Sequence, residues 1–472
     1  MTDDAPGAQP LPNRPRLAEY AAARRHVVDG REIVTVHDLR GGDHVELTAR
    51  AWSLVEHADG TRDLGGVELA AARAGVLRRS SELREALERL HAAGLLAAGV
   101  DHGPPHVAPP KGRRLEPLAG ATFACDGGGP CCGVYGSIEM THDEARRALA
   151  LVVEAPAVAR KMTPSMGSFA LEAVAAPMID GRCAFHTDDG RCAIHAAADE
   201  AAKPRACSIY PRTFVDDGES VRVSLALECA CAFASGVDAP PMLDPRMTTT
   251  DDLGRWARVA PLPAEIPLAP GKIGGQSQLA AWSRAVVAAD APVDVASAFW
   301  ALAGAVAAHG LDVARSVEAI RTSSPPTEIE LVPWLEAVAA RARGRVRSAA
   351  WRSERDVSRA ASGWMRDAAE RLLEPMGRRL ALDDQAFAAD ERRFLAHTVH
   401  GHRLVEGVTI ERALRDRAVR VLLGRAMAPV LDAARDEPAW PGEATLRHPL
   451  GLVEAMMRGH ALRAYASAVP DR

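Results

Sequence analysis

The sequence predicts an α+β chain that is mostly helical, with a winged-helix-like module, an irregular cysteine-cluster domain and a C-terminal all-α domain. Three observations predict this fold class. Short β-branched runs with turn signals precede amphipathic helical patterns in the first hundred residues. All eight cysteines then lie between Cys125 and Cys231. Beyond Ser277, apolar residues recur at spacings of three and four, which is typical of packed helices.

Composition and length set the domain organisation. The chain is 47% hydrophobic and 25% charged, as in ordinary globular proteins. Its length suggests about three domains of roughly 150 residues each. Proline- and glycine-rich stretches mark the boundaries. We expect a tail over 1–15, a winged-helix-like module over 16–98, a linker over 99–117, a cysteine-cluster domain over 118–238, a linker over 239–277 and a helical domain over 278–472.

The first module begins with strands and ends with helices. β-branched residues flank Asp29 and Gly30, a dipeptide suited to a two-residue hairpin turn. The third predicted helix has Leu83, Leu87 and Leu90 on one face, and Ser81 is its expected N-cap. The remaining predicted elements are a strand over 44–48 and helices over 49–57, 64–74 and 81–93.

This order of strands and helices over 16–98 resembles the small winged-helix-type module of the PqqD-like peptide-recognition family. The motifs that carry the resemblance are residues 59–62, before the second helix, and residues 90–96, which close the third. The resemblance implies a domain that captures a peptide or protein partner along a strand edge. A winged helix used only for packing or dimerisation is the open alternative.

Charge and hydropathy exclude several functional classes. The net charge is −5 and the few lysines form no tract, so we expect no nucleic-acid partner. The longest uncharged apolar run, Val295 to Ala308, is shorter than the roughly 20 residues that span a bilayer, so no membrane association is expected. Residues 1–16 show no signal-peptide pattern. We therefore expect a cytoplasmic protein with reduced thiols; the residues leave its oligomeric state open.

The clustered cysteines indicate metal chemistry rather than disulfides, because a chain of this size needs no covalent staples. A glycine-rich loop over 125–133 lets backbone amides approach sulfur closely. Two similar pentapeptides, residues 182–186 and 191–195, flank a turn. A hairpin there would place Cys183 near Cys192. The candidate ligands are Cys125, Cys131, Cys132, Cys183, Cys192, Cys207, Cys229, Cys231 and His195.

The residues leave the identity of the metal open. Zinc takes four tetrahedral ligands, and the two Cys-x-x-His pairs within the pentapeptides would supply four. An iron–sulfur cluster is held by thiolates, which the eight cysteines also provide. Neighbouring side chains diverge, so adjacent Cys131 and Cys132 do not both ligate one ion. Structural free thiols are the third alternative.

Several cysteine motifs, taken in order, are similar to the YkgJ-like family, which is described as a zinc- or iron-chelating domain. They are Cys131-Cys132, the Cys183 to His195 segment, and Cys207-Ser-Ile-Tyr-Pro-Arg212. The resemblance covers about residues 120–235 and implies an irregular metal-binding cysteine-cluster domain. The chain departs from the family pattern where five residues separate Cys125 from Cys131, and where His186 stands at a usually apolar position.

The Tyr-Pro-Arg ending and the long helical C-terminal region resemble the flagellin lysine N-methylase branch of that family. This resemblance implies S-adenosylmethionine-dependent methylation of a protein lysine, with the cysteines holding an iron–sulfur cluster. Three interpretations remain open: such an enzyme, a non-catalytic metal-binding protein that recognises a partner, and a redox or metal-handling protein. Another histidine cluster, His397, His400 and His402, does not share one helical face, so we expect a core or solvated role for it.

Overall fold

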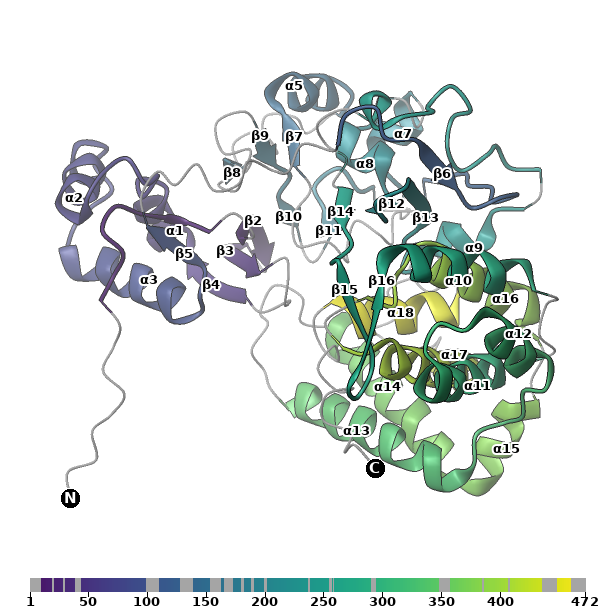
Figure 1. Cartoon of the computed structure of the whole chain (residues 1–472). Helices are drawn as coiled ribbons and strands as arrows, with labels where there is room; N and C mark the ends of the chain where they lie inside the picture. The colour runs from purple at the N-terminus through teal and green to yellow at the C-terminus, as the bar shows by residue number, and fades with distance from the viewer. Residues whose placement is uncertain are drawn as a thin grey trace. The chain divides into compact units, whose positions relative to one another are not determined.

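The computed structural model consists of two compact units, which are described separately. Unit 1 comprises Met1–His106 and Tyr135–Ala206, and unit 2 comprises Val107–Val134 and Cys207–Arg472 (Figure 1). The residues expected to form one cysteine-cluster domain are therefore divided between the two units. The structure describes residues 10–18, 21–28, 30–38, 44–98, 110–127, 139–152, 163–164, 173–179, 182–187, 191–198, 202–236, 238–253, 257, 259–289, 294–347, 357–383, 386–405, 408–434 and 448–459.

Unit 1 begins with the predicted hairpin. Strands β2 (Ala21–Val28) and β3 (Arg31–Asp38) pair antiparallel along their whole length, and β4 (His44–Thr48) continues the meander. Gly30 has a φ of 72°, a conformation that L residues rarely adopt, so the predicted turn chemistry is confirmed. Two further strands, β1 (Pro15–Leu17) and β5 (Leu96–Ala98), form a separate antiparallel pair.

Three helices cover the core of this module, namely α1 (Ala49–Val55), α2 (Leu64–Arg73) and α3 (Ser80–Ala92). The predicted stripe of Leu83, Leu87 and Leu90 is completely buried in α3. The expected N-cap was wrong: α3 already begins at Ser80, so Ser81 lies inside the helix. Arg79 occupies the cap position without a side-chain hydrogen bond.

The rest of unit 1 comes from the cysteine segment. Thr141 caps α5 (His142–Ala150) in a complete capping box with Glu144, as predicted. Two short strands extend the sheet of the first module, giving the order β11-β10-β2-β3-β4. A second small sheet has the order β7-β9-β8. The elements are β7 (Glu139–Thr141), β8 (Thr163–Pro164), β9 (Ala173–Ala175), β10 (Met178–Ile179), β11 (Arg182–Cys183) and α7 (Ala193–Ala197).

Unit 2 has a four-stranded sheet of order β14-β12-β13-β6. Part of the expected linker over 239–277 forms strands, since Ile266 and Leu268 are buried against the core while their neighbours Glu265 and Pro267 are exposed. The strands of unit 2 are β6 (Leu115–Pro117), β12 (Arg212–Asp216), β13 (Val221–Leu225), β14 (Val259–Pro261), β15 (Glu265–Ala269) and β16 (Lys272–Gly275).

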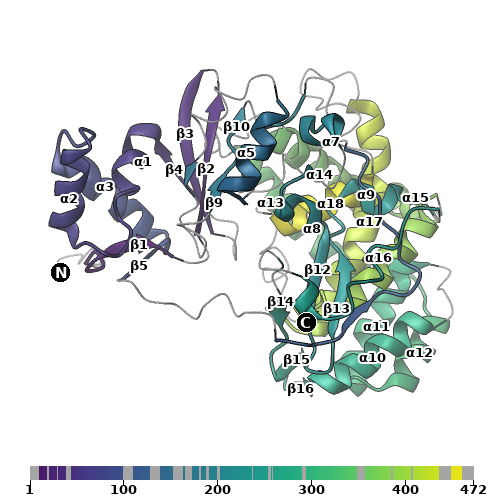
Figure 2. The ribbon, with the colours of Figure 1, turned by 90° about the horizontal axis from the view of Figure 1, so that it is seen from above.

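Helices make up most of unit 2, as the sequence predicted. Helix α16 packs against β13, while α12 contacts both α10 and α11 (Figure 2). In the described ranges, no helix has the length and apolar character needed to cross a membrane. The helices are α9 (Ala230–Ala234), α10 (Gln276–Ala288), α11 (Val295–His309), α12 (Val313–Arg321), α13 (Glu328–Arg347), α14 (Val357–Leu373), α15 (Pro375–Asp383), α16 (Ala388–His400), α17 (Ile410–Ala434) and α18 (Pro449–Gly459).

Candidate metal centre

The structure places the predicted thiol ligands in two groups. Cys183 and Cys192 belong to unit 1. Four others belong to unit 2, namely Cys125, Cys207, Cys229 and Cys231. The predicted ligands Cys131 and Cys132 lie outside the described residues. Helix α8 (Arg205–Ile209), which carries Cys207, contains the boundary between the units.

The segments that carry the unit 1 pair of cysteines are paired with each other. The backbone N–H of Ala193 donates to the carbonyl of Phe185 at 2.7 Å. His186 forms an antiparallel bridge with Cys192, one residue before Ala193. Cys183 ends β11 and accepts at its carbonyl from the N–H of His186 at 2.8 Å. Both thiols therefore lie on segments that pair with each other.

The Cys192 sulfur is partly removed from solvent, and backbone donors are directed at it. Burial raises the pKa of its thiol, and the neighbouring Cys183 thiol raises it further. The backbone N–H groups of His195 and Ile194 donate to the sulfur, and the charge of Lys203 also opposes the increase. Such donors favour the thiolate, which is the form that ligates metals. The predicted ligand His195 therefore contributes its backbone N–H to this sulfur.

Two of the unit 2 thiols lie at the short helix α9. Cys229 precedes this helix and Cys231 lies in it, and both are buried. The Cys231 Sγ donates to Oδ1 of Asp126 at 3.2 Å. The Ser235 hydroxyl donates to the carbonyl of Cys231 at 2.7 Å and accepts from the N–H of Ala124 at 3.0 Å. These contacts hold the segment before and after Cys125 against α9.

The helical part of unit 2 positions α9. Arg393 on α16 donates to the carbonyls of Phe233 at 2.6 Å and Ala232 at 3.2 Å, which belong to the C-terminal turn of α9, where carbonyls lack helical partners. The Phe233 ring stacks on His448 with centroids 4.0 Å apart and planes inclined by 5°. His448 in turn lies 3.0 Å from Asp390 through Nε2. The two late cysteines are therefore anchored to the C-terminal helices.

Arg212, from the Tyr-Pro-Arg motif, connects two cysteine-bearing segments of unit 2. Its Nη1 donates to the carbonyl of Ser208, the residue after Cys207, at 2.8 Å. Its guanidinium also lies 5.3 Å from the ring centroid of Phe123, two residues before Cys125. The arginine thus packs on one segment and hydrogen-bonds to the other.

The described thiols supply pairs rather than a complete ligand set. Among the residues that the structure describes, no group of three or more His, Cys, Asp or Glu side chains is arranged to hold an ion. Zinc requires four ligands, and an iron–sulfur cluster commonly takes four thiolates. The two thiols of unit 1 would supply half of the ligands that either site requires. A complete site would need further ligands from elsewhere in the chain.

Sequence reasoning missed the residues that position these thiols. Asp126 had a local signal, because it is an acidic residue directly after a predicted ligand. Arg393 and His448 had none, since they lie more than 150 residues beyond α9 in the sequence. Their roles arise only from the packing of α16 and α18 against α9.

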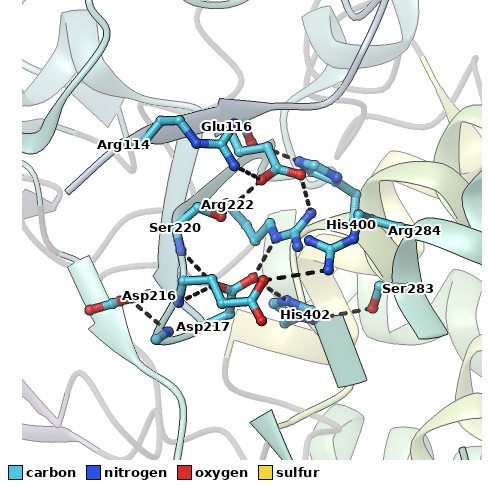
Figure 3. A network of polar contacts seen from close by, with 12 residues as sticks. Arg114, Glu116, Asp216, Asp217, Ser220, Arg222, Ser283, Arg284, His400 and His402 are labelled. Atoms are coloured by element: carbon cyan, nitrogen blue, oxygen red, sulfur yellow. Dashed lines mark hydrogen bonds and ion pairs between the residues drawn. The ribbon is translucent and has the colours of Figure 1, made fainter. Parts of the chain in front are cut away.

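A buried polar network lies beside the sheet of unit 2 (Figure 3). Arg222 is completely buried and binds Asp217 through Nε at 2.6 Å and Glu116 through Nη1 at 2.5 Å. His402 lies 3.6 Å from Asp217 through Nε2 and 3.3 Å from the Ser283 hydroxyl through Nδ1. Burial opposes ionisation of Asp217, but hydrogen bonds from Ser220 and Arg222, together with the nearby His402, hold its pKa below the usual range.

The histidine cluster has a core role, as expected from the sequence. His397, His400 and His402 are all buried. His397 Nδ1 accepts from the backbone N–H of Leu225 at 3.2 Å, and His400 Nε2 lies 2.9 Å from the carbonyl of Glu116. Burial lowers the pKa of His397 to about 3 and of His400 to about 4. These side chains are neutral near pH 7 and connect α16 to the sheet.

Comparison with protein-family models, with curated proteins and with solved structures finds no match. The chemical interpretation of the thiols therefore depends on their geometry and on the sequence motifs. The geometry is most specific at Cys183 and Cys192, which lie on paired segments, with two backbone donors directed at the Cys192 sulfur.

Proposed function

We propose that this chain is a metal-binding cysteine-cluster protein that holds zinc or an iron–sulfur cluster. One observation carries the proposal: Cys183 and Cys192 lie on segments that pair with each other, and backbone N–H groups are directed at the Cys192 sulfur. Thiolates with such donors are the ligands that both zinc and iron–sulfur clusters use. In this irregular segment, the bonds between a metal and its ligands would supply folding free energy.

The unit 2 thiols support the same proposal. Cys229 and Cys231 are buried on α9, and Asp126 accepts from Cys231. Four separate contacts, from Ser235, Arg393, His448 and Asp126, hold this small helix in place. Metal ligands are commonly oriented by hydrogen bonds of this kind. These contacts thus fix the positions of Cys229 and Cys231.

The proposal is tested by metal analysis of the full chain purified without oxygen. Iron, zinc and acid-labile sulfide are counted per chain, and the absorption spectrum is recorded. An iron–sulfur cluster would give a broad band near ~400 nm and about four irons. Zinc would give a colourless protein with one or two ions. A chain with neither metal nor sulfide, and no uptake on reconstitution, would contradict the proposal.

Two variants localise the metal. Cys192→Ser removes a ligand from the unit 1 pair, whereas Ala197→Ser places the same hydroxyl at an exposed position of the same helix, α7. We expect Cys192→Ser to lose metal and to lower the melting temperature of the loaded protein, and Ala197→Ser to change neither. Equal metal content in both variants would exclude Cys192 as a ligand.

The resemblance to the flagellin lysine N-methylase branch extends the proposal to S-adenosylmethionine-dependent methylation of a protein lysine. This extension depends on the resemblance alone. Calorimetric titration of S-adenosylmethionine into the metal-loaded chain tests it directly. Saturable heat would support the methylase. No heat would leave the alternative, a non-catalytic metal-binding protein that recognises a peptide or protein partner.

A further inference from the structure

The β2 edge of the N-terminal module is closed by a strand from the cysteine segment. β10 lies parallel to β2, with Met178 opposite His26 and Ile179 opposite Val27. These partners are about 150 residues apart in the sequence. A β-sheet edge accepts an extended strand through its unpaired backbone groups. In this chain the accepted strand is its own, and it directly precedes the first thiol of the Cys183 and Cys192 pair.

Arg24 marks the place where the cysteine segment joins the module. Its side chain is completely buried, and Nε donates to the carbonyl of Ala176 at 3.1 Å. Ala176 and Met178 are buried as well. A guanidinium on a strand edge is solvated when the edge is open, so closing this edge removes a charge from water. That desolvation opposes closure, whereas the hydrogen bond to Ala176 favours it.

Backbone pairing continues from β2 to both thiols. Cys183 on β11 lies opposite Met178 on β10. The N–H of Ala184 donates to the carbonyl of Pro177 at 2.9 Å, which adds a third link between the two strands. Beyond β11, the bridge between His186 and Cys192 continues the pairing. Each thiol therefore belongs to a row of paired segments that starts at the module's own strands.

Without a bound metal, few backbone pairs hold this edge closed. Only two residues of β10 pair with β2, whereas β2 and β3 pair over eight. Short pairings are marginal in water without further support. Desolvation of the buried Arg24 also opposes closure of the edge. A cross-link between β11 and the segment around Cys192 would reduce the conformational freedom of the open state, much as a disulfide does.

We propose that metal ligation by Cys183 and Cys192 locks β10 onto β2, so that the metal state of this pair decides whether the strand edge of the module is closed. The inference rests on the proposed metal-binding function and adds a regulatory role to it. The metal-loaded chain has a closed β2 edge. The metal-free chain exposes Arg24 and the backbone groups of β2 to an incoming extended peptide.

Hydrogen exchange of the full chain, with zinc alone as the probe, tests this coupling. Exchange is followed by mass spectrometry in peptides covering Ala21–Val28, with α2 (Leu64–Arg73) as the reference within the same module. Thiol alkylation in the same samples reports whether zinc occupies Cys183 and Cys192. We expect zinc to protect both thiols and to slow exchange in β2 about tenfold, with α2 unchanged.

Two variants test the contact at the strand edge and the thiol ligand separately. Arg24→Met removes the contact with Ala176, and we expect about tenfold weaker zinc binding, as for other residues that support a metal site. Arg25→Met is the matched control, because the neighbouring Arg25 instead pairs with Glu32 on β3 at 2.9 Å and should leave zinc binding unchanged. In Cys183→Ser, exchange in β2 should no longer respond to zinc, while protected α2 amides show that the module is folded.

The outcomes distinguish this inference from the proposed function. Protected thiols together with slowed β2 exchange would support both. Protected thiols with unchanged β2 exchange would overturn the coupling and leave metal binding intact. Thiols that zinc does not protect would overturn both statements for this pair.

Discussion

The Cys231 thiol donates to the carboxylate of Asp126 at 3.2 Å, although the two residues are 105 positions apart. Asp126 directly follows Cys125, so this contact joins the first described cysteine segment of unit 2 to the last. Both ends of the interaction are supported by Ser235, which binds Ala124 and the carbonyl of Cys231. The geometry indicates that Asp126 orients a thiol of the candidate metal centre.

Asp126→Ala is therefore expected to weaken metal binding in unit 2 about tenfold, since removing a residue that orients a metal ligand commonly costs 10- to 100-fold. Competition with a chromophoric chelator measures the change. Asp238→Ala is the control, because Asp238 is exposed in the same part of the chain. Equal affinities in the two variants would show that the contact has no role in metal binding.

Arg393→Met should destabilise the chain by about 1–3 kcal/mol, because it leaves the carbonyls at the end of α9 without their donor. The neighbouring Arg392 is exposed, so Arg392→Met should have little effect. Urea unfolding of the metal-free proteins gives the difference. We also expect the metal affinity of Arg393→Met to fall. A variant with unchanged stability would mean that α9 does not need this cap.

Acid should destabilise unit 2 through its buried histidines. Burial lowers the pKa of His397 to about 3 and of His400 to about 4, from the ordinary value of 6.5. At a pH between the lowered pKa and 6.5, the unfolded chain therefore binds more protons than the folded chain. Stability is fully present above pH 6.5 and is lost as the pH falls toward 4, by about 1.4 kcal/mol per pH unit for each histidine.

Urea unfolding at pH 8, 6.5 and 5 measures this loss in the wild type and in His400→Gln. The variant should show a shallower pH dependence, whatever its absolute stability. His309→Gln is the control, since His309 is exposed at the end of α11. If His400→Gln kept the full slope, His400 would not contribute to the acid sensitivity.

Asp217→Asn should destabilise unit 2 by about 3–5 kcal/mol, because it leaves the buried Arg222 without its completely buried anionic partner. The exposed pair of Asp244 and Arg246 provides a contrast, and Asp244→Asn should leave the melting temperature almost unchanged. Differential scanning calorimetry of both variants decides the matter. Similar melting temperatures would mean that the network in Figure 3 contributes little to stability.

Local patterns predicted local structure well. The hairpin at Gly30, the apolar stripe of α3 and the capping box at Thr141 are all confirmed. Each depends on residues within a few positions of one another, so the sequence contains the whole interaction. The N-cap of α3 was wrong because Ser80 and Ser81 are chemically equivalent, and packing decides which of them begins the helix.

The sequence by itself determined the fold class, the local elements and the kinds of ligand available, because propensity, turn chemistry and side-chain identity are properties of short segments. Only the tertiary structure decided which thiols lie together. It divided the cysteines between two units, set Asp126 beside Cys231 and laid β10 along β2. These contacts join segments more than a hundred residues apart. Their free energy comes from burial and pairing that exist only after the whole chain has packed.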